Sequence, residues 1–205
     1  MSKSLLVGAV IFDEFELLDM FGPLEMLGMY PDTFELQMIA EKPGPMRSAQ
    51  GPSAHVDATF SQSPQFDILL VPGGRGTRDQ VENAEMLDWL RSQASAARYV
   101  SSVCTGSALL AKAGVLDGMS ATTNKAAFSW VTSQGPEVSW VAQARWVEDG
   151  KFFTASGVSA GMDMTLALIA HIMGDEAADQ VATWTEYDWH RDPSWDPFAE
   201  IHNLV

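Results

Sequence analysis

Short apolar runs alternate with helix-forming segments along this chain, and that alternation constrains its fold more than any other feature. Residues 5–12 are continuously apolar, which is typical of a strand buried on both faces. Further strands are predicted at residues 34–40, 67–71, 99–103 and 121–123, and residues 141–147 and 152–155 form a predicted hairpin around Asp149-Gly150. Repeated β-then-α units predict an α/β fold with a mostly parallel central sheet covered by helices on both faces.

Helices are predicted at residues 19–29, 83–97, 126–132, 159–173 and 175–189, the last capped by Asp175. Residues 41–61 are rich in Pro, Gly, Ser and Ala, so we expect a loop with one short edge hairpin. From about residue 191 the tail should be irregular, because two Asp-Pro steps disfavour helix before each proline. The length of 205 residues fits one domain, residues 1–205.

The overall charge narrows the range of partners. A net charge of −15 argues against binding to nucleic acid or to an anionic membrane surface. The apolar run at residues 5–12 is too short to cross a membrane, and no small-residue cleavage site follows it. One cysteine excludes an internal disulfide and suits a reducing compartment, so we expect a cytoplasmic protein.

The single cysteine, Cys104, lies where a β-branched run stops and a helix-forming run begins. Such a strand-to-helix turn exposes a side chain on a sharp bend, and a helix N-terminus favours negative charge. A thiol there should ionise more easily than a free one and could act as a nucleophile. The alternative is that Cys104 only fills space, as many unpaired cysteines do.

In an open α/β sheet, sites form beyond the carboxyl ends of the strands, and three further loops there carry suitable residues. Asp19 lies between apolar neighbours, so its pKa should be raised and it could transfer protons, although it could equally be a helix N-cap. The glycine loop with Gly73 and Gly74 lacks a phosphate-binding pattern; it is either a plain tight turn or a source of N–H groups for an anionic intermediate. Gly157 and Val158 open the last loop.

The sequence predicts neither a metal site nor a cofactor. The histidines are His55, His171, His190 and His202, and no pair of them has the spacing of a helical metal site. A histidine distant in the sequence could still approach Cys104, so a Cys-His dyad stays open. In the tail, Trp195 and Phe198 are candidates for a subunit contact or a pocket wall.

Five motifs together carry a family resemblance. They are Leu18-Asp19-x-x-Gly22-Pro23-x-Glu25, Val71-Pro72-Gly73-Gly74, Val103-Cys104-Thr105-Gly106-Ser107, Ala121-Thr122-Thr123 and Ala160-Gly161-Met162-Asp163. In this order the chain resembles the DJ-1/PfpI superfamily (class I glutamine amidotransferase-like) from Val7 to about Phe198. The resemblance implies a flavodoxin-like three-layer sandwich, a cysteine on a nucleophile elbow, a small-molecule substrate and a homodimer.

Within that superfamily the chain looks most like the isonitrile hydratases (isocyanide hydratases), which need no cofactor. The resemblance implies that Cys104 attacks the isonitrile carbon and that Asp19 supplies a proton and then activates water. Backbone N–H groups of Gly74 and Thr105 would stabilise charge, the Thr105 hydroxyl would orient Asp19, and Gly157 and Val158 would line the pocket. Protease-like members carry a histidine at the position of Thr105, so peptidase activity is not expected.

Other functions remain open. Many relatives have a histidine where this chain has Asn124, which leaves the substrate undetermined. One alternative is a glyoxalase-like enzyme acting on small dicarbonyls through a hemithioacetal. Another is a non-enzymatic redox sensor or stress-response protein with an oxidisable Cys104. A transcription regulator is less expected, because regulators of this superfamily add a DNA-binding domain and this chain ends at Val205.

Overall fold

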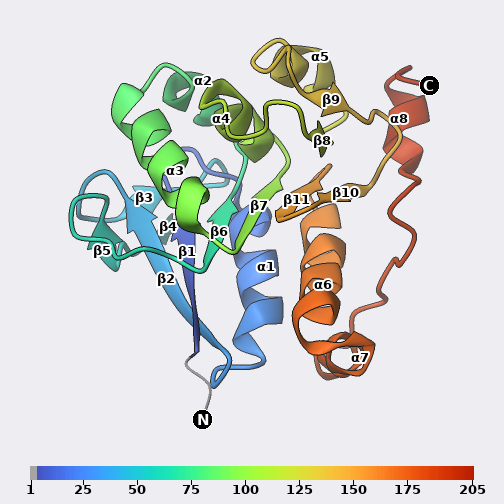
Figure 1. Ribbon diagram of the computed structural model, residues 1–205, viewed down its shortest axis with the longest axis horizontal. Coiled ribbons are helices and arrows are strands. Elements are labelled where there is room, and N and C mark those ends of the chain that lie inside the picture. Colours follow the sequence, from blue (N-terminus) through green and yellow to red (C-terminus); the bar gives the residue numbers. More distant parts are fainter. Residues whose placement is uncertain (1–3) are drawn as a thin grey trace.

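The computed structural model describes residues 4–205, and its centre is a seven-stranded sheet in the order β10-β11-β7-β6-β1-β2-β5 (Figure 1). Every neighbouring pair is parallel except β10 and β11. The strands are β1 (Leu5–Val10), β2 (Phe34–Ala40), β5 (Ala58–Thr59), β6 (Ile68–Val71), β7 (Tyr99–Val103), β10 (Trp146–Asp149) and β11 (Phe152–Ala155). The predicted mostly parallel α/β sheet is confirmed.

Helices cover both faces of the sheet. Helix α1 (Leu17–Gly28) packs beside α6 (Ala160–Met173) on one face, and α3 (Ala84–Ala96) packs beside α4 (Gly106–Lys112) on the other (Figure 1). The two faces follow from chain order: β1 to β2 and β6 to β7 run in opposite directions across the sheet, and right-handed crossovers then place their helices on opposite sides. The central strands β6 and β1 are almost fully buried, as continuous apolar runs predict.

Smaller elements complete the chain. The predicted hairpin within residues 41–61 is present as β3 (Met46–Arg47) with β4 (Ser53–Ala54). Strand β8 (Ser120–Ala121) pairs with β9 (Ser139–Trp140), and α2 (Thr77–Gln80) and α5 (Phe128–Thr132) are short helices. None of the helices within residues 4–205 is both long and apolar enough to span a bilayer.

The C-terminal predictions need three corrections. Helix α7 (Asp175–Trp184) stops five residues early, because Glu186 adopts a left-handed backbone (φ 50°) that ends the helix. Gly174, not Asp175, is its N-cap residue. The tail from residue 191 is not wholly irregular: α8 (Pro197–Ile201) begins with a proline, which is tolerated in the first turn, and the Asp196 side chain caps it.

Candidate active site

Cys104 lies on the turn between β7 and α4, in a left-handed backbone conformation (φ 56°). Its N–H donates to the Ala155 carbonyl at 3.0 Å, and its own carbonyl accepts from the hydroxyls of Thr123 at 2.9 Å and Ser107 at 3.2 Å. The residue is 8% exposed. The chain therefore holds Cys104 firmly by its backbone while the side chain is nearly closed off from water.

Asp19 lies in the first turn of α1 and is fully buried. Its Oδ2 accepts from the N–H of Gly73 at 2.9 Å, and its Oδ1 is buried with no hydrogen-bond partner among residues 4–205. Glu16 occupies the N-cap position of α1, so the N-cap interpretation of Asp19 is wrong. The carboxyl group is close enough to the Cys104 thiol for each to affect the pKa of the other.

The glycine loop after β6 is packed against Asp19 and Thr105. A Cβ on Gly73 would lie 2.6 Å from the Thr105 nitrogen and 2.9 Å from Asp19 Oδ2. Gly74 has a φ of 127°, and its Cβ would lie 2.3 Å from the Glu14 carbonyl oxygen. Glycine is thus required at both positions for close approach of the backbone. The Gly73 N–H holds Asp19, and is therefore not a free donor for an intermediate.

Thr105 bonds to the glycine loop rather than to Asp19. Its Oγ1 accepts from the Gly74 N–H at 3.1 Å and lies 3.1 Å from the hydroxyl of Thr77. The expectation that the Thr105 hydroxyl orients Asp19 is not met, and the Gly74 N–H is also engaged. Thr77 is fully buried and donates to the Gly74 carbonyl at 2.7 Å. Sequence reasoning missed Thr77, although its position directly after the glycine loop was a usable signal.

Gly157 packs directly on Cys104. A Cβ on Gly157 would lie 2.5 Å from Cys104 Cβ and 2.8 Å from its Cα, and Gly157 has a φ of 85°. The peptide bond from Gly157 to Val158 is cis. Four loops that are distant in sequence, carrying Asp19, the glycine loop, Cys104 and Gly157, therefore meet beyond the strand ends, as their positions predict.

Burial dominates the protonation of both acidic groups. Burial raises the pKa of the Cys104 thiol well above its usual value, and the nearby Asp19 raises it further, while the Thr105 N–H opposes the shift. Burial likewise raises the pKa of Asp19, against the Gly73 hydrogen bond. The raised pKa expected for Asp19 is confirmed, but the easily ionised thiol is not. Helix α4 has only seven residues, and the Thr105 N–H at its start offsets the desolvation of the thiol only in part.

His171, His190 and Asn124 make contacts outside the site. His171 Nδ1 lies 2.9 Å from a Glu148 carboxylate oxygen, and the backbone N–H of His190 donates to Asp163. The Asn124 side chain accepts from the Ala127 N–H, a local turn contact. Over residues 4–205, no three His, Cys, Asp or Glu side chains are grouped so that they could hold a metal ion.

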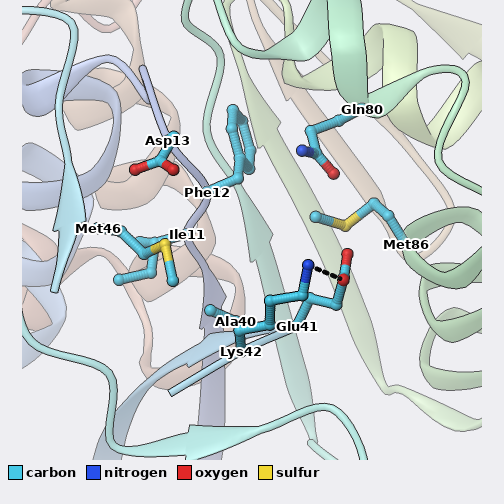
Figure 2. Close-up of a pocket in the computed structure, with 9 residues that line it drawn as sticks. All are labelled: Ile11, Phe12, Asp13, Ala40, Glu41, Lys42, Met46, Gln80 and Met86. Carbon is cyan, nitrogen blue, oxygen red and sulfur yellow. Dashed lines mark ion pairs between the residues drawn. The ribbon is translucent and has the colours of Figure 1, made fainter. Parts of the chain in front are cut away.

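A separate pocket lies near the carboxyl ends of β1 and β2 (Figure 2). Its lining is Ile11, Phe12, Asp13, Ala40, Glu41, Lys42, Met46, Gln80 and Met86. None of these belongs to the set around Cys104. The close-up shows the Lys42–Glu41 ion pair at one side of the pocket.

Comparisons with known proteins agree with the fold described above. Residues 6–171 match the model of the DJ-1/PfpI family. The chain is 36% identical to an isonitrile hydratase of Pseudomonas putida, over 90% of this chain and 79% of that protein. It is 27% identical to the HTH-type transcriptional regulator GbdR of Pseudomonas aeruginosa, of which it covers only 50%. The crystal structure of a THiJ/PfpI family protein from Pseudomonas syringae superposes with a TM-score of 0.82 at 28% identity, covering 90% of this chain and 76% of that one.

Proposed function

Because this chain belongs to the DJ-1/PfpI family and has a flavodoxin-like fold, we propose that it is a cysteine-dependent enzyme that hydrates isonitriles to N-substituted formamides. The observation that carries the proposal is the position of the Cys104 thiol beside the buried Asp19 carboxyl group, close enough for each to affect the pKa of the other. The residue after the cysteine is threonine, and the similarity to the isonitrile hydratase covers most of both chains.

In this proposal Cys104 Sγ bonds to the terminal isonitrile carbon, and that carbon receives one proton. The thiol proton passes through Asp19 to the carbon, which gives a covalent thioimidate on Cys104. Because burial raises the pKa of both groups, a proton relay is favoured over a lasting thiolate in the resting site.

The second half of the cycle consumes one water molecule. Asp19 takes a proton from water as the water oxygen bonds to the thioimidate carbon, and it passes its own proton to the nitrogen. The C–S bond then breaks, the hydroxyl proton of the adduct passes to the sulfur, and the formamide leaves with Cys104 restored as a thiol. The Thr105 N–H stabilises charge on the sulfur, and Gly157, which packs on Cys104, forms the wall beside it together with the next residue, Val158, in this proposal.

The direct test is to incubate the protein with an aryl isonitrile and quantify the formamide by chromatography. We expect wild-type turnover, a covalent adduct on Cys104 in intact-mass spectra, and no turnover by Cys104→Ala. His171→Gln, remote from the thiol, serves as the matched control and should retain activity. Turnover by Cys104→Ala at the wild-type rate would refute the mechanism. A parallel assay for lactate from methylglyoxal tests the glyoxalase-like alternative.

We also propose that the protein is a homodimer that uses the outer face of α1. Leu18 and Phe21 lie one and two positions from the buried Asp19 and are 41% and 39% exposed, so α1 presents two large apolar side chains to solvent beside the site. A second copy covering them would close the neighbourhood of the site to water.

A further inference from the structure

Asp196 lies in the C-terminal segment, far along the chain from the other site residues. We propose that Asp196 is a positioning residue for Cys104 and acts through Ser156. The inference rests on the proposed function and extends it, because it assigns part of the site's geometry to a segment outside the four loops.

Asp196 is a buried carboxylate, 2% exposed, and both of its oxygens are engaged. Oδ1 accepts from the N–H of Phe198 at 3.1 Å, which caps α8. Oδ2 accepts from the hydroxyl of Ser156 in a short hydrogen bond. A buried charge is costly unless it is hydrogen-bonded or paired, so these contacts fix its position.

Ser156 stands between two residues that both contact Cys104. The carbonyl of Ala155 accepts from the Cys104 N–H, and Gly157 packs against its Cα and Cβ. The Ser156 N–H donates to the Arg145 carbonyl at 2.8 Å, and the Ser156 hydroxyl donates to Asp196. A shift of Ser156 would therefore move both backbone contacts of the nucleophile together.

Asp196 is also connected, through Lys125, to the turn that carries Cys104. The Lys125 Nζ is hydrogen-bonded to Thr122 Oγ1 at 2.8 Å and to the Ala144 carbonyl at 2.6 Å. Burial lowers the pKa of Lys125 to about 8, and the negative charge of Asp196 opposes that shift. Thr123, next to Thr122, holds the Cys104 carbonyl. Asp196 thus stabilises the charge of the buried lysine on the segment that fixes the other side of Cys104.

The segment that carries Asp196 is itself anchored. The Pro193 carbonyl accepts from the Arg145 N–H at 2.8 Å, and Asp163 accepts from the Tyr187 hydroxyl at 3.1 Å and from the His190 N–H at 2.9 Å. Arg145 and Asp163 form a buried ion pair at 2.6 Å. Asp196 therefore presents its carboxylate from a fixed frame, which a positioning residue requires.

The test uses Asp196→Asn, Ser156→Ala and the double variant, with Asp192→Asn as the control. Asp192 is an exposed carboxylate of the same segment, and its contacts are with Ser194. Three quantities are measured: kcat and KM for an aryl isonitrile, the pH dependence of Cys104 alkylation by iodoacetamide, and thermal unfolding. Because Cys104 is the only cysteine, alkylation reports on that thiol alone.

Each single variant should lower kcat about 10-fold with little change in KM, because misplacement of a nucleophile costs rate rather than binding. The double variant should also lose about 10-fold, not about 100-fold, since both changes break one contact. The pH midpoint of alkylation should fall in all three variants. Burial raises the pKa of the Cys104 thiol, and a looser loop around Ser156 would admit water to it. Asp192→Asn should match the wild type.

Additive losses in the double variant would overturn the inference, as would a midpoint that stays at its wild-type pH in folded Asp196→Asn. The two proposals fail separately. If the wild type hydrates no isonitrile, the proposed function is wrong, while a coupled shift of the alkylation midpoint still supports the positioning role.

Discussion

The thiol of Cys104 and the carboxyl group of Asp19 are both closed off from water, and burial raises the pKa of each. Their neighbours oppose this only in part: Gly73 donates one N–H to Asp19, and the Thr105 N–H favours the thiolate. Two adjacent acids that resist ionisation suit a reaction in which a proton is passed on and later returned.

Asp19→Asn separates the effects of charge and burial at this site. Removing a neighbouring negative charge stabilises the thiolate, so the pKa of Cys104 should fall and iodoacetamide alkylation should reach half-maximal rate at a lower pH. Formamide production should fall about 100-fold, because the proton relay is lost.

Glu16→Gln is the matched control for that experiment. Glu16 also raises the pKa of Cys104, but less than Asp19 does, so its variant should shift the alkylation midpoint by less in the same direction. An unchanged midpoint in Asp19→Asn would show that the carboxylate does not act on the thiol.

The sequence alone predicted that four loops lie close together, those with Asp19, Gly73 and Gly74, Cys104, and Gly157. The reason is that these loops follow the carboxyl ends of the strands, at one edge of the sheet. It could not assign hydrogen bonds. Thr105 pairs with Thr77 and Gly74 rather than with Asp19, a choice set by side-chain directions within a few ångströms. Nor could it show that desolvation outweighs the helix terminus at Cys104.

At the scale of elements, the start of α6 packs against the end of β7, next to Cys104. A Cβ on Gly161, in the first turn of α6, would lie 2.8 Å and 2.9 Å from the two γ-carbons of Val103, the residue before Cys104. A Cβ on Gly22 of α1 would instead lie 2.8 Å from Cγ of Met162. Val103 is fully buried and its β-branched side chain has little rotamer freedom, whereas Met162 can move its flexible side chain.

We therefore expect Gly161→Ala to lower the free energy of unfolding by about 1–3 kcal/mol through overpacking. Gly22→Ala should cost less than about 1 kcal/mol, because the gain in helix propensity offsets a small adjustment of Met162. Urea unfolding of both variants measures the difference. Equal stabilities would mean that the α6–β7 contact is as adaptable as the α1–α6 contact.

Element types were predicted well where apolar periodicity was long, as in β1, β2 and α6. The errors lie where tertiary contacts decide. The strand predicted at residues 141–147 begins only at Trp146, in β10, and the other errors are in the C-terminal part. Helix α7 ends at Trp184 because the chain turns so that Tyr187 and His190 can reach Asp163. Helix α8 forms because Asp196 caps it, although the Asp-Pro step disfavours helix at Asp196 itself.

At the scale of the whole molecule, the sheet and its two helical layers bury most large apolar side chains, and the exposed ones are therefore informative. Leu18 and Phe21 stand out because they lie on α1, close to the site. Trp184 of α7 is also exposed, but it packs on Tyr30 with ring centroids 5.5 Å apart. The outer face of α1 is thus the better candidate for the proposed dimer contact.

Sedimentation velocity should give the mass of a dimer for the wild type, and Phe21→Asp should shift it towards the monomer, since a charge in an apolar interface is strongly unfavourable. Trp184→Asp is the control and should remain dimeric. A wild-type protein that sediments as a monomer at all concentrations would refute the dimer, and an unchanged dimer in Phe21→Asp would exclude this face.

Strand β11 supplies the carbonyl that holds the Cys104 N–H and pairs with β7 along its whole length. During synthesis, residues 152–155 leave the ribosome some fifty residues after Cys104, by which time β1, β6 and β7 can already have assembled. Until then the β7 edge is open, and neither Ala155 nor Gly157 covers the cysteine. We therefore expect the nascent chain to pass through a stage in which its only thiol lies at an unpaired strand edge, and we expect oxidants or other nascent chains to be most damaging at that stage.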